Sequence, residues 1–280
     1  MEVIIKSEIM QRVMEKFRNN GKEISFVPTM GFLHDGHLSL MKDAKRKADI
    51  LVVSIFVNPT QFGPNEDFDK YPRDFESDKE KCESIGVDYL FYPDVKEMYG
   101  DNFKTSVFVE SLTNNLCGLI RPTHFRGVAT IVAKLFNIVK PHYAIFGWKD
   151  AQQLLIIRKM VEDLNMDVEV IGAETIREDD GLAMSSRNKY LSPEERIQAV
   201  CLKKGLDLAE QMIDKGERES NKIIGAMVSL IETYDKAKID YVKIVSQNEM
   251  KDIDKIENDN TLIAMAVYFS QTRLIDNIRI

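Results

Sequence analysis

The sequence lacks the features that mark disulfide-stabilised, membrane-spanning and nucleic-acid-binding proteins. Its 280 residues include only three cysteines, and Cys82, Cys117 and Cys201 lie far apart with no CxxC pair, which indicates a reducing compartment. The most apolar run, 50–57, is too short to cross a bilayer, and the first residues contain no apolar signal region. Acidic residues outnumber basic ones by 45 to 38, so the chain lacks the positive charge that long nucleic acid requires. We therefore expect a cytoplasmic protein that binds neither membranes nor nucleic acid.

Up to about residue 175, short apolar runs alternate with apolar residues at helical spacing. The runs at 24–27 and 50–57 are continuous, and the second is rich in β-branched residues, as a strand covered on both faces should be. Such alternation predicts βαβ units and an α/β fold with a parallel sheet, which binds ligands at the carboxyl ends of its strands. The expected strands are 24–27, 50–57, 89–91, 106–109, 143–146 and 168–171, and the expected helices are 7–19, 37–48, 129–139 and 152–164.

The pattern changes near Thr175. Ser192-Pro193-Glu194-Glu195 is a strong helix start, with Ser192 as N-cap and Glu195 closing a capping box. We expect two domains, residues 1–175 and a smaller α/β C-terminal domain, residues 176–280. In the second domain the expected helices are 194–215 and 221–234, and the expected strands are 241–245, 261–269 and 272–278.

The segment 28–37 (PTMGFLHDGH) follows the first buried strand and leads into a helix. Gly31 and Gly36 let the backbone approach a ligand, and the N–H groups at a helix start favour an anion. His34 and His37 can both face a phosphate and donate hydrogen bonds to developing charge. Only four histidines occur in the chain, and two lie in this loop. Two loop histidines without a special role remain an alternative, whereas a zinc site is weakly supported because no third ligand lies nearby.

Polar residues also follow the strand expected at 143–146. In Gly147-Trp148-Lys149-Asp150 the lysine can clamp a phosphate as a point charge. Asp150 can accept a ribose hydroxyl, although a helix cap is the commoner explanation for such an aspartate. Gln153 lies one turn further on and can point the same way. Trp148 receives no chemical role from its residue type.

Three further sites carry weaker signals. The segment 181–188 (GLAMSSRN) offers two hydroxyls and a guanidinium that suit a triphosphate, and a polar linker is its usual interpretation in isolation. Asn58 and Gln61 can bind hydroxyls and carboxylates, or form an ordinary polar turn. Asp78 is a candidate Mg²⁺ ligand, although a lone aspartate more often lies on a solvated helix face.

Taken in order, these segments resemble a known family. PTMGFLHDGH, FVNPTQF, RPTHFRGV, FGWKDAQQL and GLAMSSRNKYL are similar to the motifs of the pantoate–β-alanine ligase (pantothenate synthetase) family. His34-Asp35-Gly36-His37 resembles the HxGH signature of a nucleotidyltransferase superfamily, and Met184–Arg187 stands where that superfamily has its KMSKS-like loop. The match runs from about Ser25 to Ser192. Trp148 and Ala151 depart from the family pattern and leave the shape of the pocket wall open.

The resemblance implies a Rossmann-like domain that binds ATP and pantoate, followed by a lid domain. ATP and pantoate would give pantoyl adenylate and pyrophosphate, and β-alanine would then give pantothenate and AMP. The resemblance also implies a homodimer and Mg²⁺ on the phosphates, with Asp78 as the protein ligand that we expect. An adenylyltransferase that keeps AMP on its product and a non-catalytic nucleotide-binding module are the alternatives. The resemblance assigns catalysis to His37 and His34 and pantoate binding to Gln61 and Gln153. It assigns ATP binding to Met30, Gly31, Phe32, Leu33, His34, Asp35, Gly36, His37, Gly147, Trp148, Lys149, Asp150, Ile176, Met184, Ser185, Ser186 and Arg187.

Overall fold

A computed structural model describes residues 1–64 and 66–280 of the chain. These residues form two compact units. Unit 1 comprises Met1–Glu110, Arg121–Trp148 and Gln153–Glu174, and unit 2 comprises Ser111–Ile120, Lys149–Gln152 and Thr175–Ile280. The division at residue 175 into an N-terminal and a C-terminal domain stays a prediction.

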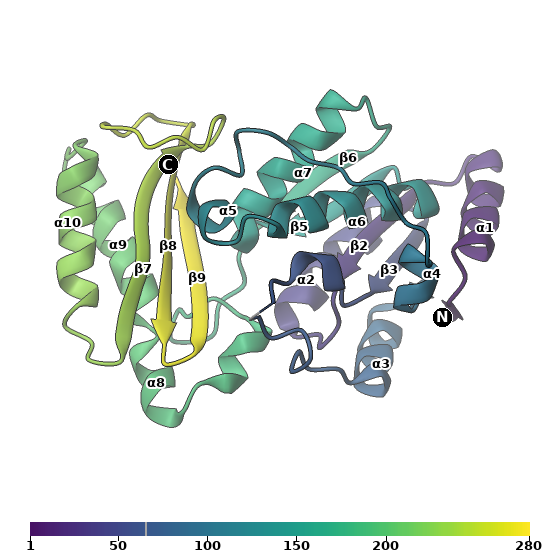
Figure 1. Ribbon diagram of the computed structural model, residues 1–280, viewed down its shortest axis with the longest axis horizontal. Coiled ribbons are helices and arrows are strands. Elements are labelled where there is room, and N and C mark those ends of the chain that lie inside the picture. The colour runs from purple at the N-terminus through teal and green to yellow at the C-terminus, as the bar shows by residue number, and fades with distance from the viewer. Residues whose placement is uncertain (65) are drawn as a thin grey trace. The chain divides into compact units, whose positions relative to one another are not determined.

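Unit 1 contains a parallel sheet with the strand order β1-β4-β3-β2-β5-β6 (Figure 1). Every pairing in this sheet is parallel, which confirms the α/β fold expected from the alternating pattern. Short β1, at the edge of the sheet, was not predicted. The strands are β1 (Glu2–Ile4), β2 (Ile24–Thr29), β3 (Ile50–Ile55), β4 (Tyr89–Phe91), β5 (Tyr143–Gly147) and β6 (Glu169–Ala173).

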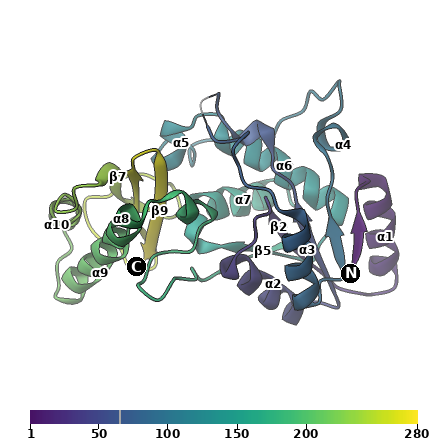
Figure 2. The ribbon, with the colours of Figure 1, turned by 90° about the horizontal axis from the view of Figure 1, so that it is seen from below.

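Helices cover both faces of this sheet (Figure 2). Phe26 of β2 packs on the α6 face, where its ring centroid lies 6.4 Å from that of Phe136. The next residue, Val27, joins the opposite cluster, which includes Met41 and Ala44 of α2. Alternate residues of β2 therefore face opposite layers, which is why the neighbouring residues Phe26 and Val27 are both apolar and buried. The helices are α1 (Ser7–Asn19), α2 (Asp35–Lys47), η1 (Pro59–Gln61), α3 (Phe75–Ile85), α4 (Val95–Tyr99), α6 (His124–Val139), η2 (Trp148–Asp150) and α7 (Ala151–Asp163).

The strand order reverses at the centre of the sheet. From β2 the chain builds outward through β3 to β4, and it then returns to place β5 on the other side of β2. Ser25 and Phe26 of β2 pair with Tyr143 and Ala144 of β5. In open α/β sheets ligands bind at such a reversal, outside the carboxyl ends of the strands. The segments that follow Thr29 of β2 and the end of β5 both begin at this reversal of strand order.

Unit 2 contains an antiparallel sheet in the order β7-β8-β9. Helices α9 and α10 pack against it through an apolar cluster that includes Leu206, Met227 and Met265. The capping box at Ser192 forms as expected, with Ser192 and Glu195 bonding each other's backbone N–H. The elements are α5 (Leu116–Ile120), η3 (Ser186–Tyr190), α8 (Pro193–Gln198), α9 (Cys201–Asp214), α10 (Ser220–Ile231), β7 (Ala237–Ser246), β8 (Thr261–Phe269) and β9 (Thr272–Arg279).

Two expected elements differ from the structure. The strand expected at 106–109 does not form, because the N–H of Val107 donates to the hydroxyl of Thr130 on α6 (2.9 Å) rather than to a neighbouring strand. The single helix expected at 194–215 is divided into α8 and α9. At the break, the N–H of Leu202 bonds the carbonyl of Ala199, three residues back (3.2 Å), so the α-helical ladder is interrupted.

Among the described residues, every helix is too short or too polar to span a membrane.

Glu97 on α4 links that helix to the start of α1 and generates a pH prediction. Its carboxylate accepts hydrogen bonds from the Ser7 hydroxyl, from Lys6 Nζ (2.9 Å) and from the Ser7 N–H (3.0 Å). These bonds lower the pKa of Glu97 from 4.5 to about 2. A lowered pKa contributes stability above pH 4.5, and that contribution is lost as the pH falls toward 2. Wild type should therefore have a higher Tm than Glu97→Gln above pH 4.5, with a difference that shrinks on acidification.

Thermal unfolding over this pH range measures the difference. Glu8→Gln, at an exposed position of α1, is the control and should show no comparable trend. A difference between wild type and Glu97→Gln that does not change with pH would contradict this account.

Candidate active site

The two histidines after β2 lie together at the start of helix α2. His34 is the N-cap, and its Nδ1 accepts the N–H of Gly36 (3.2 Å). The Nδ1 of His37 in turn accepts the N–H of His34 (3.3 Å). Since both Nδ1 atoms accept, a neutral imidazole at either position carries its proton on Nε2. The ring centroids are 4.1 Å apart, so two Nε2–H donors lie at a helix N-terminus, where anions are stabilised.

The backbone before these histidines adopts an unusual conformation. Gly31 and Phe32 both have positive φ, +82° and +54°. A Cβ on Gly31 would lie 2.9 Å from Asp78 Oδ2 and 2.9 Å from Ile55 Cγ2, so only glycine fits at this position. A non-glycine residue with positive φ, such as Phe32, needs surrounding contacts to hold it.

Asp78 on α3 supplies those contacts. Its carboxylate accepts the N–H groups of Phe32 (2.7 Å) and Leu33 (2.7 Å), one on each oxygen, and the residue is 1% exposed. Lys81, one turn further along α3, donates to the carbonyl of Leu33 (2.8 Å). Burial raises the pKa of Asp78, against the opposing effect of the two N–H bonds. Nothing in the sequence indicates that Asp78 anchors the loop, because the contact joins segments more than 40 residues apart.

The described residues contain no group of three or more His, Cys, Asp and Glu side chains arranged to hold a metal ion. Asp78 as a Mg²⁺ ligand stays a prediction. Because both of its oxygens already bond backbone N–H groups, a metal would have to share them with the loop.

Gln61, after β3, lies close to Met30, after β2. Its Nε2 is 3.1 Å from the Met30 sulfur, and its Oε1 accepts from Asn58 Nδ2 (3.1 Å). The Oδ1 of Asn58 accepts from the Tyr99 hydroxyl (2.5 Å). Asn58 is 1% exposed, so it acts inside the protein and holds Gln61, rather than presenting its amide to a ligand. Tyr99 was not recognised from the sequence, where nothing connects it to this loop.

The residues at the end of β5 and after it differ in their burial and in their contacts. Gly147 pairs with Ala173 of β6 at the end of the strand. Trp148 is buried, and a Cβ on Gly172 would lie 2.4 Å from its Nε1. The guanidinium of Arg158 lies over the Trp148 ring, 5.1 Å from its centroid. Trp148 is thus a packed residue of unit 1, and its place in the ATP site stays a prediction. Gln153 is half-buried on the first turns of α7.

The remaining predicted residues belong to unit 2. Ile176 and Met184 come together because the chain between them forms a tight hairpin, in which the Met184 N–H bonds the Ile176 carbonyl (3.0 Å). The Ser185 hydroxyl caps η3 by accepting the N–H of Arg187 (3.3 Å). Lys149 and Asp150 end the short helix η2. The predicted site residues are therefore divided between the two units, with Met30–His37, Gln61, Asp78, Gly147, Trp148 and Gln153 in unit 1 and Lys149, Asp150, Ile176 and Met184–Arg187 in unit 2.

Comparison with known proteins identifies the family. The family model described as pantoate-beta-alanine ligase matches residues 2–279. The chain belongs to this family. It is 55% identical over 278 residues to the pantothenate synthetase of Caldicellulosiruptor saccharolyticus, covering 99% of each chain. It is 53% identical over 277 residues to that of Syntrophus aciditrophicus, covering 99% of this chain and 96% of the relative.

Solved structures of the ligase family have the same fold. Pantothenate synthetase from Thermus thermophilus superposes with a TM-score of 0.95 at 41% identity, covering 100% of this chain and 99% of the other. Pantoate-beta-alanine ligase from Francisella tularensis, solved in complex with beta-gamma ATP and beta-alanine, has a TM-score of 0.81 at 34% identity, covering 100% and 97%. The likeness includes both sheets, because it extends over the whole chain.

The anchoring of the loop by Asp78 leads to a stability prediction. In Asp78→Ala the buried N–H of Leu33 and the partly buried N–H of Phe32 lose their acceptor. An unsatisfied buried group costs about 1–3 kcal/mol, and a partly buried one costs less because water can reach it. We expect a loss of about 2–4 kcal/mol in the free energy of unfolding, measured by urea denaturation. Glu76→Ala, at an exposed position of the same helix, is the control. If the two variants were equally stable, Asp78 would not hold the loop.

Proposed function

We propose that this protein is an ATP-dependent ligase that condenses pantoate with β-alanine to give pantothenate, AMP and pyrophosphate. The observation that carries the proposal is the match of residues 2–279 to the pantoate–β-alanine ligase family. The two histidines at the N-terminus of α2, after central strand β2, support it. The N-terminal part, residues 1–175, would bind ATP and pantoate, and residues 176–280 would act as the lid.

The reaction has two steps. In the first, a carboxylate oxygen of pantoate attacks the α-phosphorus of ATP, the bond to the β-phosphate oxygen breaks, and pyrophosphate leaves. The product is pantoyl adenylate, in which the carboxyl oxygen has become part of a good leaving group. In the second, the amine of β-alanine attacks the acyl carbon, AMP leaves with the electron pair of the broken C–O bond, and the nitrogen loses a proton.

His37, with His34, would stabilise the first transition state. Negative charge gathers on the α-phosphate oxygens as the pantoate oxygen approaches. Two Nε2–H groups at the N-terminus of α2 are preorganised donors for that charge, because backbone N–H groups hold both Nδ1 atoms. In the second step the same Nε2–H groups would donate hydrogen bonds to the phosphate of the departing AMP. These donors would lie beside the phosphate without blocking attack in line with the leaving group.

The remaining ATP contacts would come from both units. The backbone of Met30–Leu33 and Asp35–Gly36 lines the approach to the histidines, Gly147–Asp150 follows β5, and Ile176 lies beside Met184. Lys149 and Arg187 would bind the phosphates, and Ser185 and Ser186 would donate hydroxyl hydrogen bonds. The chain has a net charge of −7, so attraction of these anions has to be local. The Met184–Asn188 segment would close over the adenylate and exclude water.

Neutral amides would hold pantoate. Gln61 and Gln153 can donate to its carboxylate and accept from its hydroxyls. The support for Gln61 is its fixed position beside Met30, which connects the loops after β2 and β3. A fixed amide binds a hydroxy acid without rearranging its own partners, which lowers the entropic cost of binding. Gln61 would also border the site of β-alanine.

Mg²⁺ would enter with the nucleotide and neutralise charge on its phosphates. Mg²⁺ keeps several waters and often uses one or two protein carboxylates. This requirement is compatible with a site without a cage of acidic side chains. Asp78 would be the protein ligand only if its oxygens served the loop and the metal together.

The enzyme would act in the cytoplasm as a homodimer. All three cysteines are free and buried, which suits a reducing compartment. Dimerisation rests on the resemblance to the family, and light scattering at a mass of twice 32.2 kDa would support it.

The function is tested by incubating the protein with ATP, Mg²⁺, pantoate and β-alanine. We expect pantothenate, AMP and pyrophosphate in equal amounts, and loss of the reaction when EDTA removes the metal. Omission of β-alanine should leave only adenylate formation. A product that retains AMP would indicate an adenylyltransferase, and ATP binding without pyrophosphate release would indicate a nucleotide-binding module. Either result with folded protein would contradict the proposed ligase.

Two substitutions separate the chemical role of His37 from its capping role. His37→Ala removes the whole imidazole, whereas the side chain of His37→Asn can still accept the His34 N–H but lacks Nε2. We expect both to reduce adenylate formation by about 10²–10³, because loss of one preorganised donor has this effect. Pyrophosphate release measures the rate, and circular dichroism checks folding. Near-normal rates in His37→Asn would leave His37 with a capping role alone.

A further inference from the structure

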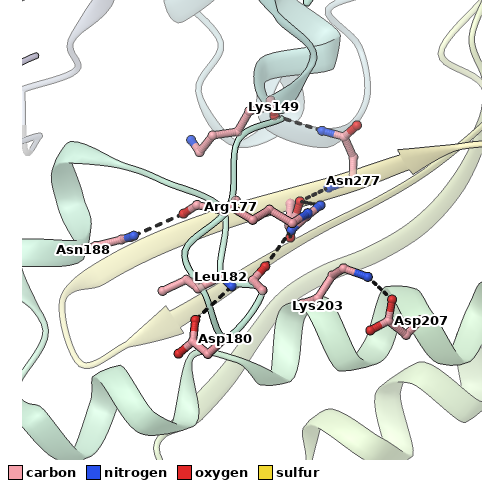
Figure 3. A network of polar contacts seen from close by, with 11 residues as sticks. Lys149, Arg177, Asp180, Leu182, Asn188, Lys203, Asp207 and Asn277 are labelled. Carbon is pink, nitrogen blue, oxygen red and sulfur yellow. Dashed lines mark hydrogen bonds and ion pairs between the residues drawn. The ribbon is translucent and has the colours of Figure 1, made fainter. Parts of the chain in front are cut away.

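Strand β9 carries two adjacent polar residues, Asp276 and Asn277, that are buried in unit 2. Figure 3 shows Asn277 with the residues around it. Asp276 and Asn277 are 1% and 8% exposed. Their partners lie on two segments that are far apart in the sequence, the short helix η2 and the hairpin 176–184. Under the proposed function Lys149 of η2 and the Ser185–Arg187 turn, which follows the hairpin, bind the phosphates of ATP.

Asp276 holds the hairpin. Its Oδ2 pairs with Arg177 Nη1 (2.6 Å) and its Oδ1 with Arg177 Nη2 (3.0 Å), the two-pronged geometry that makes an arginine–carboxylate pair directional. Arg177 Nη1 also donates to the carbonyl of Gly181 at the tip of the hairpin (3.0 Å). Arg177 and Ala183 form a β-bridge across it. A single carboxylate thus orients both sides of the hairpin.

The hairpin in turn carries the Ser185–Arg187 turn. Asn188, the next residue, donates from Nδ2 to Glu178 Oε1 (2.7 Å) and to the Ala183 carbonyl (3.1 Å). Glu178 is also fixed by Arg196 Nη2 (2.6 Å). The position of the turn therefore depends on the hairpin, and the position of the hairpin depends on Asp276.

Asn277 holds the other segment. Its Nδ2 donates to the main-chain carbonyl of Lys149 (2.9 Å). In Figure 3 the Lys149 side chain extends away from Asn277, so the bond fixes the backbone from which the ammonium extends and leaves the ammonium itself untouched.

Strand β9 is a rigid base for both contacts. Asp276 pairs with Met265 and Asn277 with Ala264 on β8. Successive side chains of a strand point to opposite faces, which allows neighbouring residues to bind two different segments. Any shift of one segment relative to the other would have to break one of these bonds or deform the sheet.

We propose that Asp276 and Asn277 are positioning residues that set the spacing between Lys149 and the Ser185–Arg187 turn. Neither residue touches substrate; each acts through the segment it holds. The proposal rests on the proposed function, because Lys149 and Arg187 bind phosphate only under it. A displacement of about 1 Å at a reacting centre can reduce a rate by about 10²-fold, so main-chain bonds of this kind are sufficient to affect catalysis.

Asn277 offers the sharper experiment, since it can be changed without breaking the ion pair. Asn277→Asp keeps the shape but loses the donor, because a carboxylate only accepts. Asn277→Ala loses the donor without adding charge. Asn248→Asp, an exposed position of the same unit, controls for the added charge. We expect kcat/KM for ATP to fall about tenfold or more in both Asn277 variants, with the KM for β-alanine within about twofold of wild type.

A double-mutant cycle tests whether Asn277 acts through Lys149. In a Lys149→Met background, Asn277→Ala should change kcat/KM for ATP by less than about twofold, because the group it positions is gone. Full additivity would overturn the proposal, as would Asn277 variants with wild-type kinetics. If the Asn277 variants lost Tm and all kinetic constants together, Asn277 would have only a structural role. That result would also overturn the proposal.

The test remains separate from that of the proposed function. ATP affinity, measured by calorimetry, should fall about tenfold in Asn277→Ala and remain unchanged in Asn248→Asp. If wild type binds ATP but makes no pantothenate, the proposed reaction is wrong, and the affinities still decide whether Asn277 positions an ATP-binding group. Asp276→Asn, if it folds, should weaken ATP binding in the same direction; unchanged affinity in that variant would remove Asp276 from the proposal.

Discussion

The pairing of β2 with both β3 and β5 is the constraint on which the rest of unit 1 depends. Because β2 lies between them, the chain reverses its winding there, and the loops after β2 and β3 begin at the same edge of the sheet. Burial on both faces holds β2 in this place, with Phe26 packed toward α6 and Val27 toward α2. A polar residue at Phe26 would therefore disturb the α6 layer and one at Val27 the α2 layer, and either would disturb the strand that leads into the histidine loop.

The candidate site relies on groups that hold the backbone as much as on groups that face a ligand. The conformation of Gly31 and Phe32 is stabilised by Asp78, and the position of Gln61 by Asn58. In unit 2, Asp276 and Asn277 act in the same manner on the hairpin and on Lys149. Such preorganisation is valuable in an acidic protein, where a few local donors have to attract two anionic substrates against the net charge.

Sequence reasoning succeeded where a property is local. The capping box at Ser192 and the strand 261–269 were predicted in place, since both depend on residues within a few positions of each other. It failed at 106–109, where the alternation suggests a strand but Val107 bonds the side chain of Thr130. Nor could it detect that Asp78 anchors a loop more than 40 residues away. An aspartate on a solvated helix face and an aspartate buried as a hydrogen-bond acceptor look the same in the sequence.

The sequence by itself determined the α/β alternation, the chemical character of each loop and, through five ordered motifs, the family. These properties depend on residue type and short-range spacing, which are the same in the unfolded and the folded chain. Only the tertiary structure decided that Asp78 and Asn58 act inward, that Ile176 meets Met184 across a hairpin, and that β9 joins Lys149 to the turn at 185–187. The hairpin contact spans eight residues, and the others join residues 45 or more apart in the sequence, so they form only when packing brings the segments within hydrogen-bonding distance.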